Sequence, residues 1–189
     1  MTTSLRYRAR QAVTWTVRDL RWGTRLWLVN DIAGHRLVPR LLRHLLYRLA
    51  AVDVQALDVS SGVTITGGPG LHIGPDTFVN HGAYFEAGGG ITIGRGCAIG
   101  PEVMVLSTSH PIDRTGWLDE TVRTPTTVGD RVWLAARVTV LPGSVVPSGS
   151  VVAAGSVVRG RLAETGIYAG NPARMVGRIG PRESRGTTP

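Results

Sequence analysis

The stretch VGDRVWLAARVTVLPGSVVPSGSVVAAGSVV, residues 128–158, carries an aliphatic residue at every sixth position. The repeated positions are Val128, Leu134, Val140, Val146, Val152 and Val158. An alternating strand has a period of two and a helix a period of 3.6 residues, so a period of six indicates neither element alone. Repeats of this length are typical of a parallel β-helix, in which each hexad forms one short strand and one corner, and three hexads complete a coil.

The same spacing extends toward the N-terminus. It relates Ile73, Val79 and Phe85, and then Ile93, Ile99 and Val105. A glycine or alanine often follows the leading aliphatic residue, and we interpret this small residue as the one that lets the backbone turn the corner. The chain has only 2 Phe, 5 Trp and 4 Tyr, which suits a narrow interior with little room for rings. A β-sandwich is disfavoured because its strands recur at about 8–12 residues.

Two interruptions of the period point to functional loops. The spacing between Phe85 and Ile93 is eight, so residues 86–90 contain a two-residue insertion at a corner. A longer excursion occupies residues 106–127. A regular solenoid that expels a loop has usually gained a binding or catalytic element there.

Composition sets the broad class of the protein. With 189 residues, 42% hydrophobic and 18% charged, the chain is long and apolar enough to fold around a core. No apolar run approaches the roughly 18–20 residues of a membrane span, and no segment resembles a signal peptide. The one cysteine, Cys97, excludes an internal disulfide and a zinc site built from several cysteines. We therefore expect a cytoplasmic protein.

The formal net charge of +8 is unevenly distributed. Residues 1–50 contain ten arginines and two aspartates, whereas residues 51–189 contain eleven arginines and eleven acidic residues. A strongly basic chain raises nucleic acid or an anionic membrane as a partner. Because the surplus belongs to one segment and no nucleic-acid-binding motif accompanies it, we expect no nucleic-acid partner.

The basic segment reads as helix from Arg36 to Leu49. Its leucines recur near the 3.6-residue period, arginines occupy much of the remaining face, and Pro39 suits a first helical turn. The favoured interpretation is that the leucines pack against the rest of the domain and the arginines lie in water. The alternative is that residues 1–50, with tryptophans upstream, make peripheral contact with an anionic membrane. The residues concerned are Leu37, Leu41, Leu42, Leu45, Leu46, Leu49, Arg36, Arg40, Arg43, Arg48, Trp15, Trp22 and Trp27.

Three further stretches carry a family resemblance. They are FVN at 78–80, STSHPID at 107–113, and the repeat at 128–158 followed by AGNPARMVGRI at 169–179. Together they resemble the hexapeptide-repeat acyltransferases of the left-handed parallel β-helix type, in particular the sugar O-acetyltransferase branch that includes maltose, galactoside and colanic-acid acetyltransferases. The resemblance covers roughly residues 71–179.

The resemblance implies a mainly β protein of three parts. Residues 1–58 form an N-terminal amphipathic helical region, and residues 59–168 form the left-handed β-helix with its excursion at 106–127. Residues 169–189 form a segment that contacts coenzyme A, followed by a tail. The resemblance also implies a homotrimer with its sites between subunits.

The implied reaction is acetyl transfer from acetyl-CoA to a hydroxyl of a sugar, polysaccharide precursor or glycosylated natural product. His110 matches the catalytic histidine, and a neutral imidazole can take the hydroxyl proton as a general base. The tetrahedral oxyanion then needs a hydrogen-bond donor. Asn80 matches a position that shapes the acceptor site. Glu86 is a second candidate for binding sugar hydroxyls, because family members often have an acidic residue at the position of Gly88.

The resemblance also assigns a site for acetyl-CoA. One pair of residues lines the pantetheine arm, a second pair belongs to a coil whose backbone bonds it, and two arginines face the phosphates. Arginine suits phosphate because its planar fork donates in pairs. These residues are Trp133 and Ala136, Ala154 and Gly155, and Arg159 and Arg174.

Other functions stay open at this stage. A zinc carbonic anhydrase shares the β-helix but needs three converging histidines. His72, His81 and His110 are present, yet no second histidine follows His110 in the excursion, so we expect no metal. An N- or O-acyltransferase acting on a non-sugar small molecule and a non-catalytic binding scaffold are the alternatives.

Overall fold

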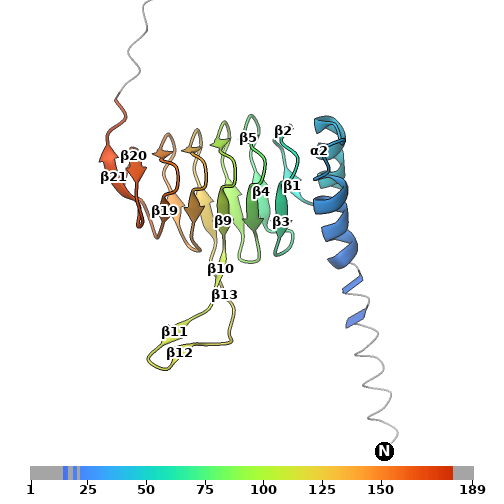
Figure 1. Cartoon of the computed structure of the whole chain (residues 1–189), viewed down its shortest axis with the longest axis horizontal. Coiled ribbons are helices and arrows are strands. Elements are labelled where there is room, and N and C mark those ends of the chain that lie inside the picture. Colours follow the sequence, from blue (N-terminus) through green and yellow to red (C-terminus); the bar gives the residue numbers. More distant parts are fainter. Residues whose placement is uncertain (1–14, 17–18, 21, 181–189) are drawn as a thin grey trace, which may run out of the picture.

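Short strands stack into three parallel sheets in the computed structural model, which describes residues 15–16, 19–20 and 22–180. The chain winds through sheets A, B and C in turn and forms a parallel β-helix of about six coils. Helices cover one end of this solenoid and a hairpin closes the other (Figure 1). The predicted β-helix is therefore confirmed. The extreme ends of the expected helical region and tail lie outside the described residues.

Each sheet is built from one strand per coil. Sheet A has the order β1 (Asp53–Val54), β4 (Leu71–Ile73), β7 (Ile91–Ile93), β14 (Thr126–Val128) and β17 (Val145–Val146). Sheet B has the order β2 (Asp58–Val59), β5 (Phe78–Val79), β8 (Ala98–Ile99), β15 (Trp133–Leu134), β18 (Val151–Val152), β20 (Ile167–Ala169) and β21 (Arg174–Gly177). Sheet C contains β3 (Thr64–Thr66), β6 (Tyr84–Glu86), β9 (Met104–Leu106), β16 (Thr139–Val140) and β19 (Val157–Val158).

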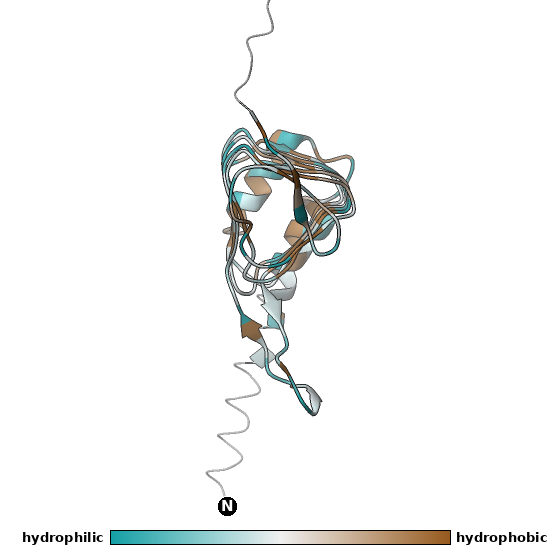
Figure 2. Ribbon diagram, turned by 90° about the vertical axis from the view of Figure 1, so that its left-hand side faces the viewer, coloured by the Kyte–Doolittle hydropathy of each residue, from teal (hydrophilic) through white to brown (hydrophobic). Residues whose placement is uncertain are grey.

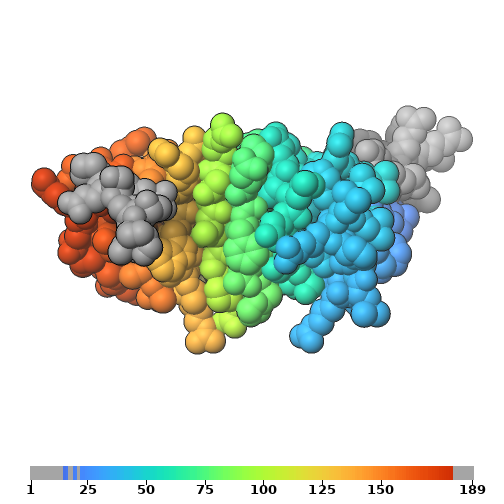
Figure 3. All heavy atoms as spheres, turned by 90° about the horizontal axis from the view of Figure 1, so that it is seen from above, coloured from blue at the N-terminus to red at the C-terminus, as the bar shows by residue number. Residues whose placement is uncertain are grey.

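The six-residue period sets the register of these sheets. In sheet B the leading aliphatic residues lie directly beside one another from coil to coil, at Val59, Val79, Ile99, Leu134 and Val152. All of them are buried. Viewed along its axis the solenoid has a three-sided outline, and from above its coils lie as adjacent bands (Figures 2 and 3). The core is thus a stack of aliphatic ladders inside the coil.

The corners use two small-residue positions for different reasons. A Cβ on Gly100, one residue after the leading Ile99, would lie 2.8 Å from the carbonyl carbon of Ala135 in the next coil. That position is small because neighbouring coils approach closely. The left-handed backbone comes two residues later, at Gly82 (φ 71°) and even at Glu102 (φ 56°). The small residue after the aliphatic one therefore permits stacking, and the turn itself is made elsewhere in the hexad.

The helical region ends earlier than the sequence indicated. Helical residues 22–26 lead into the π-helix η1 (Trp27–Ile32), and α2 (Arg40–Leu49) follows a turn. The solenoid begins at Asp53 rather than at residue 59, because β1 already pairs with β4. Within the part of the chain that the structure describes, no helix is both long enough and apolar enough to cross a bilayer.

Helix α2 faces the solenoid with the side that the sequence assigned to water. Its buried residues are Arg43 and Tyr47, whereas Leu41, Leu45 and Leu49 are exposed. The guanidinium of Arg43 donates to the backbone carbonyls of Ala33, His35, Val38 and Val59. The favoured packing prediction is therefore wrong for Arg43 and for five of the six leucines, and right for Leu46, which packs against the core. A hydrophobic pattern could not reveal that four backbone carbonyls lie where they accept hydrogen bonds from a buried arginine.

Side chains of the helical region also form hydrogen bonds with backbone groups at the open edge of the first coil. Asn30 in η1 donates to the carbonyl of Ile65 at 3.0 Å and accepts from its N–H at 2.8 Å. Arg43 caps the carbonyl of Val59 in sheet B. At the other end β21 runs antiparallel to β20 and ends the parallel stack of sheet B. The cap thus occupies backbone groups at the edges of β2 and β3, and β21 covers the last parallel strand of sheet B, where exposed strand edges would invite further strand addition.

Replacing Arg43 tests this account of the cap. Arg43→Met keeps the length of the side chain but leaves the carbonyls of Ala33, Val38 and Val59 without their donor. We expect the melting temperature to fall by about 5–15 °C, because each unsatisfied buried group costs about 1–3 kcal/mol. The control, Arg48→Met, removes an exposed arginine from the same helix and should change it by less than about 3 °C. Equal melting temperatures for the two variants, measured by circular dichroism, would contradict the capping role.

Candidate functional site

The corners of successive coils line up into three edges along the solenoid. The BC edge joins sheets B and C, and the CA edge joins sheets C and A. Interior positions are filled by aliphatic side chains, so polar chemistry is confined to these edges and to the excursion. The residues suggested by the sequence divide between the BC edge and the CA edge.

Most of the suggested acceptor and coenzyme A residues lie along the BC edge. This edge carries Asn80 after β5, Ala136 after β15, and Ala154 with Gly155 after β18. The side chain of Trp133, in β15 of sheet B, is 53% exposed. Arg174 begins β21, just after the turn that reverses the chain at the end of β20. The BC edge therefore gathers six of the nine suggested residues.

Backbone hydrogen bonds join these corners from coil to coil. The N–H of Gly155 donates to the carbonyl of Ala136 at 2.9 Å, and the N–H of Gly170 donates to Ser156 Oγ at 3.1 Å. Ala154 and Gly155 are exposed beside the half-exposed Trp133. The result is a strip of small residues beside an indole ring, where an extended ligand can approach the backbone closely.

The CA edge carries the other suggested residues. Glu86 ends β6 at this edge, Arg159 follows β19, and the excursion that holds His110 leaves between β9 and β14. Figure 1 shows the excursion projecting away from the solenoid below β9. Arg159 is exposed and lies on a different edge from Ala154 and Gly155, so one chain does not bring all the suggested phosphate and pantetheine residues together.

The excursion is an ordered ribbon. Strands β10 (Thr108–Ser109) and β13 (Val122–Arg123) form its base, and β11 (Ile112–Asp113) and β12 (Gly116–Trp117) form its tip. Asp113 accepts hydrogen bonds from the N–H and hydroxyl of Thr115, and these bonds lower the pKa of its carboxyl group. The ribbon gives the residues between its two ladders a defined position.

His110 occupies the junction between base and tip. Its ring packs edge-on against Trp117, with ring centroids 5.5 Å apart and an interplanar angle of 79°. Both side chains are exposed, and no group among the described residues hydrogen-bonds to the imidazole. Its two nitrogens are therefore open to a ligand. Trp117 was not foreseen from the sequence, although an aromatic residue shortly after His110 in a loop is a signal that could have found it.

Glu86 fastens the base of the excursion. One carboxylate oxygen accepts from the hydroxyl of Thr108 at 2.8 Å and the N–H of Ser107 at 3.3 Å, and the other accepts from the N–H of Gly88 at 2.9 Å. In return Ser107 Oγ donates to the backbone carbonyl of Glu86 at 2.7 Å. These bonds occupy the carboxylate that the sequence offered to sugar hydroxyls. Glu86 thus holds β10 at Thr108, two residues before His110.

Asn80 lies on the BC edge, a full sheet away from the excursion. Its Oδ1 accepts from both the N–H and Nδ1 of His81 at 2.8 Å, with the ring tautomer set by that bond. The corner at Gly82 and the whole of β6 separate Asn80 from Glu86. A general base must lie within about 3 Å of the proton it takes. Within one chain, Asn80 and His110 therefore belong to different edges of the solenoid.

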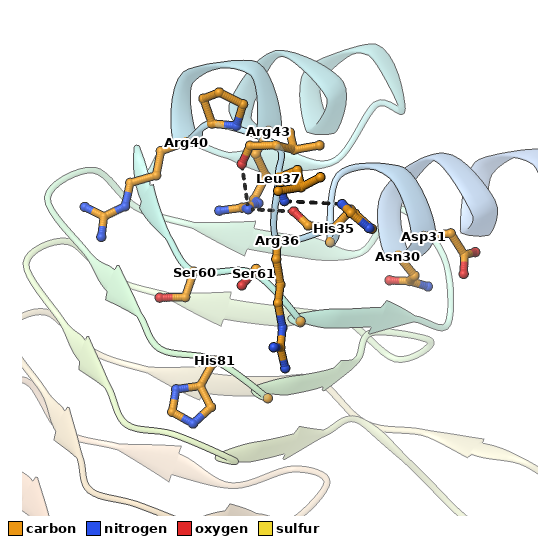
Figure 4. A pocket seen from close by; sticks show the side chains of 15 residues that line it. Asn30, Asp31, His35, Arg36, Leu37, Arg40, Arg43, Ser60, Ser61 and His81 are labelled. Carbon is orange, nitrogen blue, oxygen red and sulfur yellow. Dashed lines mark hydrogen bonds between the residues drawn. The ribbon is translucent and has the colours of Figure 1, made fainter.

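A cavity of about 1210 Å³ opens beside Asn80, between the helical cap and the first two BC corners. Its polar walls come from His35, Arg36, Ser60, Ser61 and His81. In Figure 4, Arg36 extends from the turn before α2 toward the corner that carries His81. Sequence reasoning missed this cavity. Aligning the hexads would have placed Ser60 and Ser61 directly beside Asn80 and His81, because Val59 pairs with Val79.

An ion pair bridges the next two BC corners. Arg137 Nε lies 2.6 Å from Glu102 Oε2, and this hydrogen bond lowers the pKa of the Glu102 carboxyl group. Both residues have a positive φ. The pair lies between the corner of Asn80 and the strip of small residues, and it ties these two parts of the edge together.

The three histidines considered for zinc lie apart. His72 is in β4 and hydrogen-bonds to Asp53 at 2.7 Å, His81 is on the BC edge, and His110 is in the excursion. Across the described stretches of the chain, no group of three or more His, Cys, Asp or Glu side chains is arranged to hold a metal ion.

Comparison with known proteins gives the family. No family model matches the chain. Nodulation protein L of Rhizobium leguminosarum bv. viciae is 36% identical over 157 residues, which is 80% of each chain. A Dictyostelium discoideum protein named as an acetyltransferase is 41% identical over 115 residues, 59% of this chain. The chain spans only 60% of the length of that relative.

Solved structures agree with the sequence relatives. A Vibrio cholerae hexapeptide-repeat acetyltransferase in complex with acetyl-CoA has a TM-score of 0.75 and 25% identity, covering 87% of this chain and 90% of the other. A galactoside acetyltransferase in complex with coenzyme A has a TM-score of 0.70 and 26% identity, covering 86% and 81%. With the hexad register and the extended match to nodulation protein L, these likenesses show that the chain belongs to the hexapeptide-repeat acetyltransferase family, in the branch of the sugar O-acetyltransferases.

Proposed function

We propose that this protein transfers the acetyl group of acetyl-CoA to a hydroxyl of a saccharide, at sites assembled between the subunits of a homotrimer. The observation that carries the proposal is that the candidate base and the candidate binding residues lie on two different edges of one chain. His110 projects from the CA edge, while Asn80 and the strip at Ala136, Ala154 and Gly155 lie on the BC edge. The excursion of one subunit laid along the BC edge of its neighbour would unite them.

His110 acts as the general base. Its neutral imidazole accepts the proton of the acceptor hydroxyl while the hydroxyl oxygen attacks the thioester carbonyl. The tetrahedral intermediate collapses, the carbon–sulfur bond breaks, and the imidazolium returns its proton to the departing thiolate of coenzyme A. The open nitrogens of His110 and its contact with Trp117 support this role.

Acetyl-CoA is expected along the BC edge, and the residues present there fit it. An extended pantetheine arm suits the strip of small residues beside the indole of Trp133, where backbone groups can bond it. Arg174 lies at the end of that strip and can bind a phosphate. Arg159 lies on the CA edge, so it would contact the phosphates of the molecule bound to a neighbouring subunit.

A saccharide acceptor fits the polar cavity beside Asn80. The cavity offers hydroxyl, imidazole and guanidinium groups, which can all hydrogen-bond to sugar hydroxyls. The likeness to a galactoside acetyltransferase favours a sugar over another small-molecule acceptor. Because acetyl-CoA is drawn from the cytoplasm, we place the protein there.

Replacing the proposed base tests catalysis. His110→Ala should lower acceptor-dependent release of coenzyme A by about 10²–10⁴-fold, because it removes general-base catalysis. His72→Ala, a histidine in sheet A far from the BC edge, is the matched control and should keep wild-type activity. The measurement is thiol release from acetyl-CoA with a panel of saccharides, followed by mass spectrometry of the products. Similar rates for the wild type and His110→Ala would sink the assignment, and no release by wild type with any acceptor would favour a binding scaffold.

Glu86 is expected to act as a positioning residue. Glu86→Gln replaces an oxygen that accepts hydrogen bonds with an amide that donates, so the anchor of Thr108 and Ser107 is weakened. We expect kcat to fall by about tenfold with the KM for acetyl-CoA nearly unchanged, because the base moves while the BC edge does not. Glu164→Gln, near the far end of the solenoid, serves as the control. A raised KM for the acceptor at unchanged kcat would instead make Glu86 a direct acceptor ligand.

Mixing two inactive variants tests whether sites lie between subunits. His110→Ala loses the base on the CA edge, and Ala154→Trp fills the strip on the BC edge. In a mixed trimer one of the three interfaces pairs an intact base with an intact strip, so purified mixed trimers should regain about a third of wild-type activity. The measurement is activity after co-expression and purification of trimers that carry both tags. A mixture as inactive as either parent would place the whole site within one chain.

A further inference from the structure

Helix α2 presents its apolar side to the outside. We define the leucine face as Leu37 in the turn before α2 together with four leucines of the helix. Their exposed fractions are 84% for Leu37, 66% for Leu41, 47% for Leu42, 51% for Leu45 and 75% for Leu49. Large apolar patches on a protein surface usually mark an interaction site.

The outward direction of the leucine face is fixed by what lies beneath the helix. Successive residues of a helix are about 100° apart, so Arg43 and Tyr47 share one side and Leu41 and Leu45 lie on the opposite side. One hydrogen bond of Arg43 ties the first side to Val59 of the solenoid, and the other three tie it to the carbonyls of residues 33–38 before α2. Rolling the helix to hide the leucines would break all four bonds. The hydrogen bonds of Arg43 therefore keep the leucine face exposed.

The surroundings of the leucine face are aromatic and cationic. Upstream, the indoles of Trp15, Trp22 and Trp27 are 56%, 40% and 56% exposed. Arg48 lies next to Leu49 in α2, is exposed, and forms no ion pair with any residue in the described ranges. All of the formal charge of +8 falls within residues 1–50, and the remaining chain is balanced.

We propose that the leucine face docks the protein on an anionic membrane surface. A helix that lies in the interface buries apolar side chains among the acyl chains, places arginines at the headgroups, and adds tryptophans at the boundary. The cap supplies all three. A contact between two copies through this face is disfavoured, because residues 1–50 of each copy carry the whole formal charge of +8. An anionic surface complements that charge.

Vesicle sedimentation with the full-length protein tests the proposal. The probes are vesicles of phosphatidylcholine with 30% phosphatidylglycerol and vesicles of phosphatidylcholine alone. The test variant is Leu41→Gln/Leu45→Gln. The matched control is Leu57→Gln, which alters a leucine of comparable exposure, 59%, on the first coil outside the leucine face. The melting temperature and the subunit number by light scattering are measured for every protein.

The expected results are specific. The wild type and Leu57→Gln pellet with anionic vesicles, they pellet less at 0.5 M salt, and they stay in the supernatant with neutral vesicles. The double variant keeps its melting temperature and subunit number but binds anionic vesicles at least about tenfold more weakly, because two apolar side chains no longer enter the lipid. Acetyl transfer in solution is unchanged in the double variant, so this result does not depend on the proposed function.

Other outcomes overturn the proposal. No pelleting of the wild type with anionic vesicles, or equal pelleting of the wild type and the double variant, removes the leucine face as the docking surface. Equal pelleting with neutral vesicles removes the role of anionic lipid. A changed subunit number in the double variant shows instead that the leucines join copies of the chain.

Discussion

Parallel pairing between coils is the constraint on which the rest of the structure depends. Each short strand satisfies its backbone groups only through the coil before it and the coil after it, so no coil is stable alone. This requirement fixes the six-residue register and the buried ladder that runs from Val59 to Val152 in sheet B. It also leaves open sheet edges at both ends. Asn30 and Arg43 bond to the edges of sheets C and B at one end, and antiparallel β21 covers sheet B at the other.

A filled solenoid restricts where function can lie. The interior has no space for a ligand, and changes in the regular corners disturb the stacking, since even one Cβ at Gly100 would meet the next coil at 2.8 Å. Insertions are tolerated where one coil is opened at a single corner, as at residues 107–125. The excursion and the N-terminal cap are therefore larger departures from the repeat than the two-residue insertion at residues 86–90, and both border polar residues of the edges.

The sequence predicted what depends on the repeat and missed what depends on single polar contacts. The aliphatic ladder and the excursion follow from counting in sixes, because a fixed period maps each residue to one sheet or corner, whereas the small residues of the BC edge were expected from the family resemblance. The burial of Arg43 could not be counted in this way, since it depends on four carbonyls contributed by two separate segments. Glu86 is similar. Its type suggested a sugar ligand, but its hydrogen bonds to Ser107 and Thr108 are visible only when the excursion is folded back on its strand.

Arg43 differs from the exposed arginines of the helical cap because its guanidinium is buried. A buried guanidinium is tolerated only when its N–H groups find acceptors, because desolvating a charge costs several kcal/mol. The carbonyls of residues 33–38, before α2, and of Val59 at the open edge of β2 supply those acceptors, and lysine, with a single ammonium, could not span them. Because that one arginine points inward, the helix has no freedom to turn its leucines inward as well. The exposure of the leucines is thus a consequence of the burial of Arg43.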